Sequence, residues 1–257
     1  MLENKVVVIT GASSGIGALT AKKLSQQGAY VILTGRSEAR LKEAVSGMPG
    51  KYETIQMDIG NAEEVKAVVH DIEARHGVID VLVNNAGYGV FENFLDAPPE
   101  RFQDMMDVNY MGIVRTTQAV LPVMLKQGFG QIVNIASIAG KMGIAKSSGY
   151  AASKHAVLGL TNSLRQELRG TGITVSSVNP GPIDTPFFDQ ADPSGQYVKN
   201  ISWFVMKPDY VADRIVHLIK KRKEELNLPR SAAAGMRIYQ LFPRLMDKVL
   251  YRWLDMK

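Results

Sequence analysis

The sequence predicts an α/β protein: a single doubly wound domain with a parallel sheet and helices on both faces. Three observations lead to this prediction. Short runs rich in Val and Ile alternate with stretches of helical periodicity along most of the 257 residues. The apolar runs are nearly continuous, which is typical of parallel strands buried on both faces. No internal repeat and no linker divides the chain.

The elements follow one another in a regular order. The first predicted strand, Val6–Thr10, consists mainly of β-branched residues, and the next helix runs from Gly15 to Gln27 and stops at Gly28, a residue type that often ends helices. The same signals predict strands over 30–34, 52–57, 78–84, 131–136 and 173–178, and helical segments over 61–76, 100–127 and 149–169. Residues 224–229 form at most a short strand.

Composition and charge exclude several kinds of function. The chain has no cysteine, so disulfides, thiolate metal ligands and thiol catalysis are excluded. Its four histidines lack the spacing of metal ligands, and we expect no metal site. The net charge of +5 comes from the C-terminal part, since residues 220–257 hold ten basic and four acidic side chains. The rest of the chain therefore lacks the basic surface of a nucleic-acid-binding protein.

The cellular location is predicted from the lack of a membrane-spanning run and of a signal peptide in this sequence. No apolar run reaches the roughly 18 residues that span a bilayer, and the first strand starts too early to leave room for a signal peptide. We expect a cytoplasmic protein, with peripheral membrane contact as an alternative. That alternative rests on a predicted amphipathic helix over 243–257, which carries basic residues beside an apolar stripe. Such a stripe packs on the protein's own body, on a sister subunit or in a membrane interface.

A long irregular segment interrupts the alternation of strands and helices. Residues 184–207 contain five aromatic side chains, namely Phe187, Phe188, Tyr197, Trp203 and Phe204. Loops of this length inside a compact domain usually bind or cover a ligand. We predict a substrate lid, and its aromatic content favours an apolar substrate such as a lipid or a steroid-like ketone.

A glycine-rich turn joins the first strand to the first helix. Thr10–Gly17 has the spacing GxxxGxG, which allows a tight turn and close approach of a pyrophosphate to the N-terminus of the helix. The second strand ends at Gly35-Arg36, where enzymes that use NAD usually carry an acid. A guanidinium can instead pair with a 2′-phosphate. These residues predict NADP(H) in preference to NAD(H), unless Arg36 is only a solvated surface charge.

Six motifs stand in the order and approximate spacing of the short-chain dehydrogenase/reductase family. They are Thr10–Gly17, Asn84–Gly87, Asn109, Ser137, Tyr150–Lys154 and Pro180–Thr185. The chain resembles this family over roughly residues 4–225. The resemblance implies a Rossmann-fold catalytic domain over 1–226, followed by a C-terminal helical extension over 227–257.

The resemblance also implies four catalytic residues. Tyr150 is expected to be the general acid/base, and Lys154 lies four positions on, on the same helix face. A nearby ammonium should lower the pKa of the phenol. By resemblance, Lys154 also bonds the nicotinamide ribose, Ser137 binds the substrate carbonyl, and Asn109 holds a water in a proton relay.

Cofactor contacts follow from the same resemblance. They comprise the glycine turn, the end of the second strand, a pair flanking the adenine, the strand end beneath the adenosine and the positions around the nicotinamide amide. These residues are Gly11, Ser13, Ser14, Gly15, Ile16, Gly17, Arg36, Asp58, Ile59, Asn85, Ala86, Gly87, Tyr150, Lys154, Pro180, Gly181, Ile183 and Thr185. Asn84 is expected to have a structural role, tying neighbouring strands together.

The sequence thus predicts an NADP-preferring carbonyl reductase or alcohol dehydrogenase acting on an apolar ketone or aldehyde. The chain lacks the glycine-rich turn near an acid in which many family members end, so we expect a homodimer through segments 100–127 and 149–169 instead of a tetramer. One alternative is an NADP-binding sensor without turnover. Another is a 3-ketoacyl thioester reductase, although Gly128 and Thr171 stand where such enzymes typically carry basic docking residues.

Overall fold

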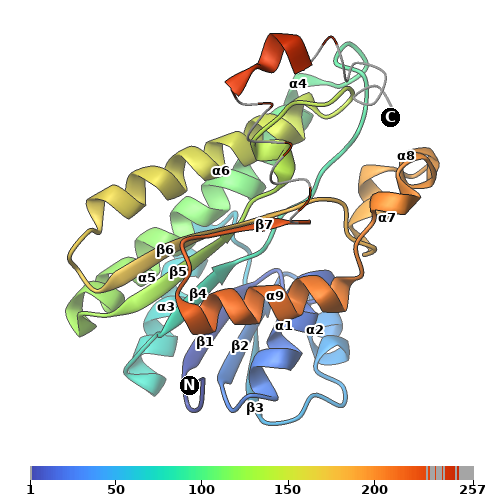
Figure 1. The fold of residues 1–257 in the computed structure, drawn as a ribbon. Coiled ribbons are helices and arrows are strands. Elements are labelled where there is room, and N and C mark those ends of the chain that lie inside the picture. Colours follow the sequence, from blue (N-terminus) through green and yellow to red (C-terminus); the bar gives the residue numbers. More distant parts are fainter. Residues whose placement is uncertain are drawn as a thin grey trace.

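The computed structural model describes residues 2–229, 231, 235, 239, 241–246 and 248, and Figure 1 shows how they fold. The strands are β1 (Val6–Thr10), β2 (Tyr30–Gly35), β3 (Lys51–Gln56), β4 (Val81–Asn84), β5 (Gly130–Ile135), β6 (Ile173–Pro180) and β7 (Glu225–Leu228). The α-helices are α1 (Gly15–Ser25), α2 (Glu38–Ala44), α3 (Ala62–His76), α4 (Pro99–Met106), α5 (Gly112–Gln127), α6 (Ser148–Glu167), α7 (Phe187–Ala191), α8 (Gln196–Asn200) and α9 (Pro208–Lys221). The described residues also form the π-helix η1 (Asp107–Met111) and the 3₁₀-helices η2 (Ile138–Gly140) and η3 (Ser202–Phe204).

The strands form one parallel sheet in the order β3-β2-β1-β4-β5-β6-β7. Every residue of β1, β4 and β5 is buried, as the continuous apolar runs predict. After β3 the chain returns to the centre of the sheet and adds β4 on the free side of β1, so the strand order reverses between β1 and β4. This arrangement confirms the predicted doubly wound fold, and it opens a crevice at the carboxyl ends of these two strands.

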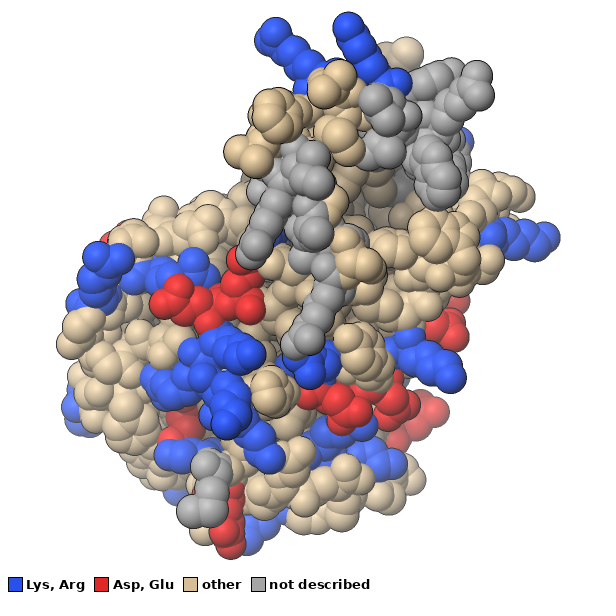
Figure 2. Space-filling model, viewed as in Figure 1, with Lys and Arg blue, Asp and Glu red and all other residues tan. Residues whose placement is uncertain are grey.

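Helices cover both faces of the sheet (Figure 1). One apolar core lies between the sheet and helices α1, α2 and α9, and a second lies between the sheet and helices α3 and α5. Lys23 on α1 pairs with Asp209 at 3.3 Å and Asp213 at 2.9 Å on α9. Acidic and basic side chains lie side by side on the face seen in Figure 2. The packing of both helix layers on the sheet fixes the positions of the carboxyl ends of the strands.

The segment 100–127 differs from the prediction of one continuous helix. The π-helix η1 separates α4 from α5 and contains the fully buried Asn109. A π-turn inserts one extra residue into the helical path, often at a functional site. The buried asparagine sits inside that turn, so an unfavourable helix residue coincides with the break in regular helix.

The strand over 78–84 begins later than predicted. Asp80 is buried, and its carboxylate accepts hydrogen bonds from the Val6 N–H at 2.8 Å and from the Lys5 ammonium at 2.7 Å. The residue before β4 thus holds the start of β1 in place. The apolar residues on both sides of Asp80 make the strand signal extend over 78–84, although the strand itself starts at Val81.

The last strand, β7, is short, as predicted, and pairs with β6 in the register Ser177↔Glu225 to Pro180↔Leu228. The expected domain boundary at residue 226 falls inside it. Residues 243–246 are helical, whereas most of the predicted extension over 227–257, including the helix beyond residue 248, lies outside the described residues. Among the described helices, none is long and apolar enough to cross a membrane.

Candidate active site

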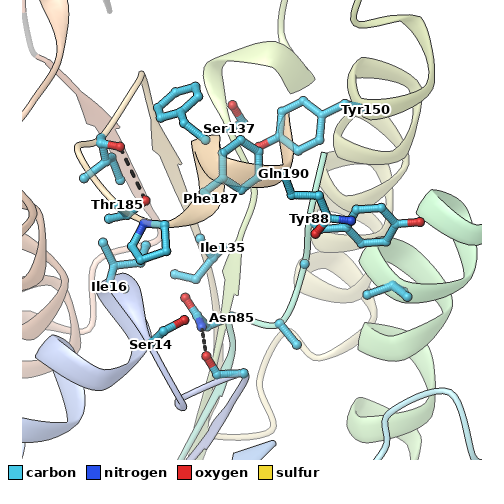
Figure 3. A pocket seen from close by; sticks show the side chains of 18 of the residues that line it. Ser14, Ile16, Asn85, Tyr88, Ile135, Ser137, Tyr150, Thr185, Phe187 and Gln190 are labelled. Carbon is cyan, nitrogen blue, oxygen red and sulfur yellow. Dashed lines mark hydrogen bonds between the residues drawn. The ribbon is translucent and has the colours of Figure 1, made fainter. Parts of the chain in front are cut away.

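A cleft of about 1370 Å³ lies at the carboxyl ends of the strands, next to the crossing point between β1 and β4. Figure 3 shows Ser14, Ile16 and Thr185 on one side of it, with Tyr150 and Phe187 on another. The predicted site residues that line it are Gly11, Ser13, Ser14, Gly15, Ile16, Arg36, Asp58, Ile59, Asn85, Ala86, Gly87, Ser137, Tyr150, Lys154, Pro180, Gly181, Ile183 and Thr185. Gly17 and Asn109 lie behind this lining.

The glycine turn packs directly on the end of β4. Gly11 has φ +63°, and a Cβ there would lie 2.6 Å from the Ala86 Cα. A Cβ on Gly17 would lie 2.5 Å from the Asn85 Nδ2, the same nitrogen that donates to the Thr10 and Gly11 carbonyls at 3.0 and 2.9 Å. Both glycines are needed because neighbouring atoms occupy the space of a side chain. The turn is therefore fixed by packing as well as by its own conformation.

The residues of this turn fit a dinucleotide. The Ser14 side chain does not cap helix α1, and the first turn of α1 contains no acidic residue. The backbone N–H groups and the positive end of the helix dipole suit a phosphate. Past the end of β2, Arg36 and Arg40 line the same cleft. The turn could hold a pyrophosphate, and the two guanidinium groups could hold a further phosphate.

Tyr150 is on helix α6, and it lines the cleft together with Ser137, which follows β5. The Ser137 Oγ donates to the Pro180 carbonyl at 3.3 Å and accepts from the Ala139 N–H at 3.1 Å. Burial raises the pKa of Tyr150 to about 12, with the nearby Ser137 hydroxyl opposing the shift. The sequence predicts a lowered pKa. This prediction is wrong for the structure because loss of solvation outweighs the attraction of any nearby charge.

Lys154 lies one helical turn beyond Tyr150. Its Nζ is 5.7 Å from the centre of the Tyr150 ring and donates to the Ile135 carbonyl at 2.8 Å. Burial lowers the pKa of Lys154 to about 8. Tyr150 and Lys154 thus lie on the same face of α6, as predicted. The Lys154 ammonium lies over the Tyr150 ring and contacts the end of β5.

Asn109 holds the loop after β4. Its Nδ2 donates to the Tyr88 carbonyl at 2.8 Å and to the Ser153 Oγ at 2.9 Å, and its Oδ1 accepts from the Tyr88 N–H at 2.9 Å. A Cβ on Gly87 would lie 2.9 Å from the Asn109 Oδ1 and 3.4 Å from the Lys154 Nζ. The structure thus brings Asn109 and Lys154 to the same glycine.

Sequence reasoning missed part of the cleft. Tyr88 and Phe91, in the loop after β4, line it together with Gln190 from α7. Phe91 packs against the predicted lid residues Phe187, Phe188 and Tyr197, which line the cleft as well. Two aromatic residues in a loop directly after a strand end were the available signal.

Other polar residues support the site without lining it. As the sequence predicts, Asn84 ties neighbouring elements together: its Nδ2 donates to the Asn134 Oδ1 on β5 at 2.9 Å and to the Thr117 Oγ1 on α5 at 3.1 Å. Within the described part of the chain, no cluster of His, Asp and Glu could hold a metal ion.

A parallel sheet with a glycine turn at the switch point, facing a tyrosine and a lysine one turn apart, defines a nucleotide-binding oxidoreductase. Residues 5–195 match the family described as short chain dehydrogenase, and the chain belongs to this short-chain dehydrogenase/reductase family. The chain is 34% identical over 262 residues to a ketoacyl reductase of Nostoc, covering 98% of this chain and 90% of that protein.

Solved structures of the family resemble this one closely. A short chain dehydrogenase/reductase from Burkholderia phymatum in complex with NAD has a TM-score of 0.86 and 26% identity, and the match covers 95% of this chain and 96% of that one. An actinorhodin polyketide ketoreductase variant with NADPH has a TM-score of 0.80 and 32% identity, covering 89% and 97%. The fold thus binds a nicotinamide cofactor, and the two neighbours hold different ones.

Proposed function

We propose that the protein is an NADP(H)-preferring reductase of an apolar ketone or aldehyde, with Tyr150 as general acid/base. The observation that carries this proposal is the grouping of Tyr150, Ser137 and Lys154 in the lining of the cleft, with the Lys154 ammonium 5.7 Å from the centre of the Tyr150 ring. Together these groups place a proton donor, a second hydroxyl and a positive charge at one point. That set suits a carbonyl oxygen that gains charge as it is reduced.

The protein's part in the reaction is to orient the carbonyl and supply a proton. With a pKa of about 12, the Tyr150 phenol is protonated at neutral pH, which is the form that donates. Ser137 holds the carbonyl oxygen beside it. The nicotinamide, when bound, supplies the hydride to the carbonyl carbon. Lys154 keeps positive charge near the phenol as the proton leaves, and Asn109 fixes the loop beside Lys154.

The preference for NADP(H) rests on Arg36 and Arg40. Both line the cleft past the end of β2, and the strand ends in Gly35-Arg36 with no acid at that position. Two guanidinium groups favour a ligand that carries a 2′-phosphate over one that does not. We assign the remaining cofactor contacts to the residues that line the cleft, with Gly17 supporting the turn from behind.

A second candidate is reduction of a 3-ketoacyl thioester. The Nostoc relative is named a ketoacyl reductase and a structural neighbour is a polyketide ketoreductase, which favours this reading. Reductases of this kind typically dock on their acidic carrier protein through basic residues. The uncharged Gly128 and Thr171 stand at those positions and argue against such docking. Either substrate requires the same four catalytic residues.

We propose a cytoplasmic homodimer through α4, α5 and α6, without a nucleic-acid partner. Membrane contact through the C-terminal segment stays an alternative, and so does a sensor that binds NADP without turnover. The sensor reading predicts cofactor binding without product.

The test measures NADPH and NADH oxidation by purified protein with ketones and aldehydes of graded size and polarity, and with a 3-ketoacyl thioester. Tyr150→Phe is the catalytic control. We expect turnover with NADPH that increases with apolar size and falls at least a hundredfold in Tyr150→Phe. Tight NADPH binding with no turnover of any compound would favour the sensor, and unchanged turnover in Tyr150→Phe would overturn the mechanism.

A further inference from the structure

Phe91 is the centre of a cluster of aromatic rings in the lining of the cleft. Its ring centre lies 5.2 Å from that of Tyr197, 6.4 Å from those of Phe187 and Phe188, and 6.1 Å from that of Tyr150. The two contacts to Tyr150 and Tyr197 are edge-to-face. We call Phe91, Phe187, Phe188 and Tyr197 the aromatic box; all four residues line the cleft.

The box joins the lid to the body of the protein. The Phe91 N–H donates to the Ala191 carbonyl on α7 at 3.0 Å. At its base the lid is closed by a bridge between Ile183 and Met206. The lid is therefore held at its base and again at α7, where Phe91 supplies the contact from the body.

Gly89 lets the box reach the proposed catalytic tyrosine. A Cβ on Gly89 would lie 2.9 Å from the Phe187 Cζ and 3.0 Å from the Tyr150 Cδ2. The Phe187 and Tyr150 rings pack 5.5 Å apart, centre to centre, and Figure 3 shows them facing the same part of the cleft. The absence of a side chain at Gly89 leaves room for this contact. An aromatic surface therefore starts directly beside the Tyr150 ring.

We propose that the aromatic box selects carbonyl compounds whose carbonyl is attached to a flat aryl group, and that Phe91 is its main specificity-determining residue. This inference rests on the proposed reductase function, which it deepens by naming the substrate class. The polar end of the pocket, Tyr150 and Ser137, takes the carbonyl oxygen. The ring of the substrate then lies among the side chains of the box.

Ring geometry is the reason to expect an aryl group instead of any apolar group. Aromatic rings attract one another in edge-to-face and offset arrangements, beyond the gain from removing apolar surface from water. A saturated ring of the same size removes similar area and lacks this attraction. For one such contact the difference amounts to roughly two- to tenfold in affinity.

The experiment compares acetophenone with cyclohexyl methyl ketone, which has a saturated ring, as NADPH-dependent substrates. Phe91→Leu removes the central ring and keeps an apolar side chain. The matched control is Phe94→Leu, because Phe94 is 68% exposed, pairs with Phe102 and does not line the cleft. We expect Phe91→Leu to lower the acetophenone preference in kcat/KM three- to tenfold, mainly through KM. The Kd for NADPH should stay within about twofold.

Several outcomes would overturn the inference. One is an unchanged preference in an active Phe91→Leu variant, and another is an equal loss in Phe94→Leu. If Phe91→Leu does not fold, Phe188→Leu removes a different ring of the box and is held to the same expectation. If the unsubstituted protein reduces neither of these ketones nor any compound of the graded series, the proposed function fails. In that case the aromatic box is tested by binding, as the Kd of acetophenone for the protein loaded with NADP⁺. Phe91→Leu must raise this Kd, and Phe94→Leu must leave it unchanged.

Discussion

The two ends of the cleft are built in different ways. At the glycine turn, Gly11 and Gly17 pack against the end of β4 so closely that the space for a Cβ is already filled. In the lid, Gly195 has a similar positive φ of +68°, but nothing lies within 4 Å of its Cβ position. Close packing fixes the conformation of the glycine turn, whereas the lid lies on the surface and contacts the rest of the protein at only a few points. A tight turn suits a ligand shared across the family, and a loosely supported lid can differ between family members to suit different substrates.

Lys154 gives the largest expected effect, and it separates activity from stability. Burial lowers the pKa of Lys154 to about 8, so folding at neutral pH places a charged ammonium where it is poorly solvated. We expect Lys154→Met to lower kcat at least a hundredfold. At pH 7 it should raise the free energy of unfolding by about 1–3 kcal/mol, less what is lost with the bond to the Ile135 carbonyl.

The pH dependence follows from the same shift. Below pH 8 Lys154 is charged in both states, and its burial costs stability in full. Between pH 8 and the ordinary pKa of 10.5 the folded state binds fewer protons than the unfolded state, so the stability of the unsubstituted protein rises with pH. Urea unfolding at several pH values should show the advantage of Lys154→Met shrinking over this range. An advantage that does not vary with pH would contradict this account.

Alanine substitutions at Gly11 and Gly195 compare the glycine turn with the lid directly. Gly11→Ala forces a side chain onto the Ala86 backbone in addition to the strain of a positive φ. We expect a loss of roughly 2–4 kcal/mol in the free energy of unfolding and at least a tenfold rise in the Kd for NADPH. Gly195→Ala has the backbone strain alone and should cost about 1 kcal/mol, without change in that Kd. Urea unfolding and cofactor fluorescence measure both quantities. Equal effects in the two variants would mean that the packing at Gly11 is unimportant.

The difference between the glycine turn and the lid also explains which parts of the site could be predicted from the sequence. The fold and the residues of the glycine turn were predictable because buried strands and required glycines leave signals in neighbouring residues. The raised pKa of Tyr150 was not, since burial depends on side chains from the lid and from the loop after β4. The role of Phe91 was missed for a related reason: its contacts are with residues 187, 188 and 197, about a hundred positions away.

Cofactor choice gives an effect of intermediate size. Arg36→Glu places a negative charge where we expect a 2′-phosphate, and it should lower the preference for NADPH over NADH in kcat/KM at least tenfold. The control is Lys42→Glu, since Lys42 pairs with Glu38 on α2 and does not line the cleft. Both variants make the same change in net charge. A loss of preference in the control as large as in Arg36→Glu would assign the effect to overall charge.

The smallest expected effects come from two capping residues, one in each region. The Asn61 Oδ1 accepts from the Glu63 and Glu64 N–H groups, both at 3.2 Å, at the start of α3. In the lid, the Asp192 carboxylate accepts from the Val198 N–H at 3.1 Å and from the Ser194 hydroxyl at 2.7 Å.

We expect Asn61→Ala to lower the free energy of unfolding by about 1 kcal/mol and to leave KM unchanged, because α3 covers the sheet and unfolds with it. Asp192→Ala should instead raise the KM for the ketone about two- to fivefold and leave global stability nearly unchanged, because a lid can open locally while the sheet stays folded. Urea unfolding and steady-state kinetics on both variants separate these effects. If Asp192→Ala lowers global stability as much as Asn61→Ala does, the lid unfolds together with the sheet and the two regions are not independent.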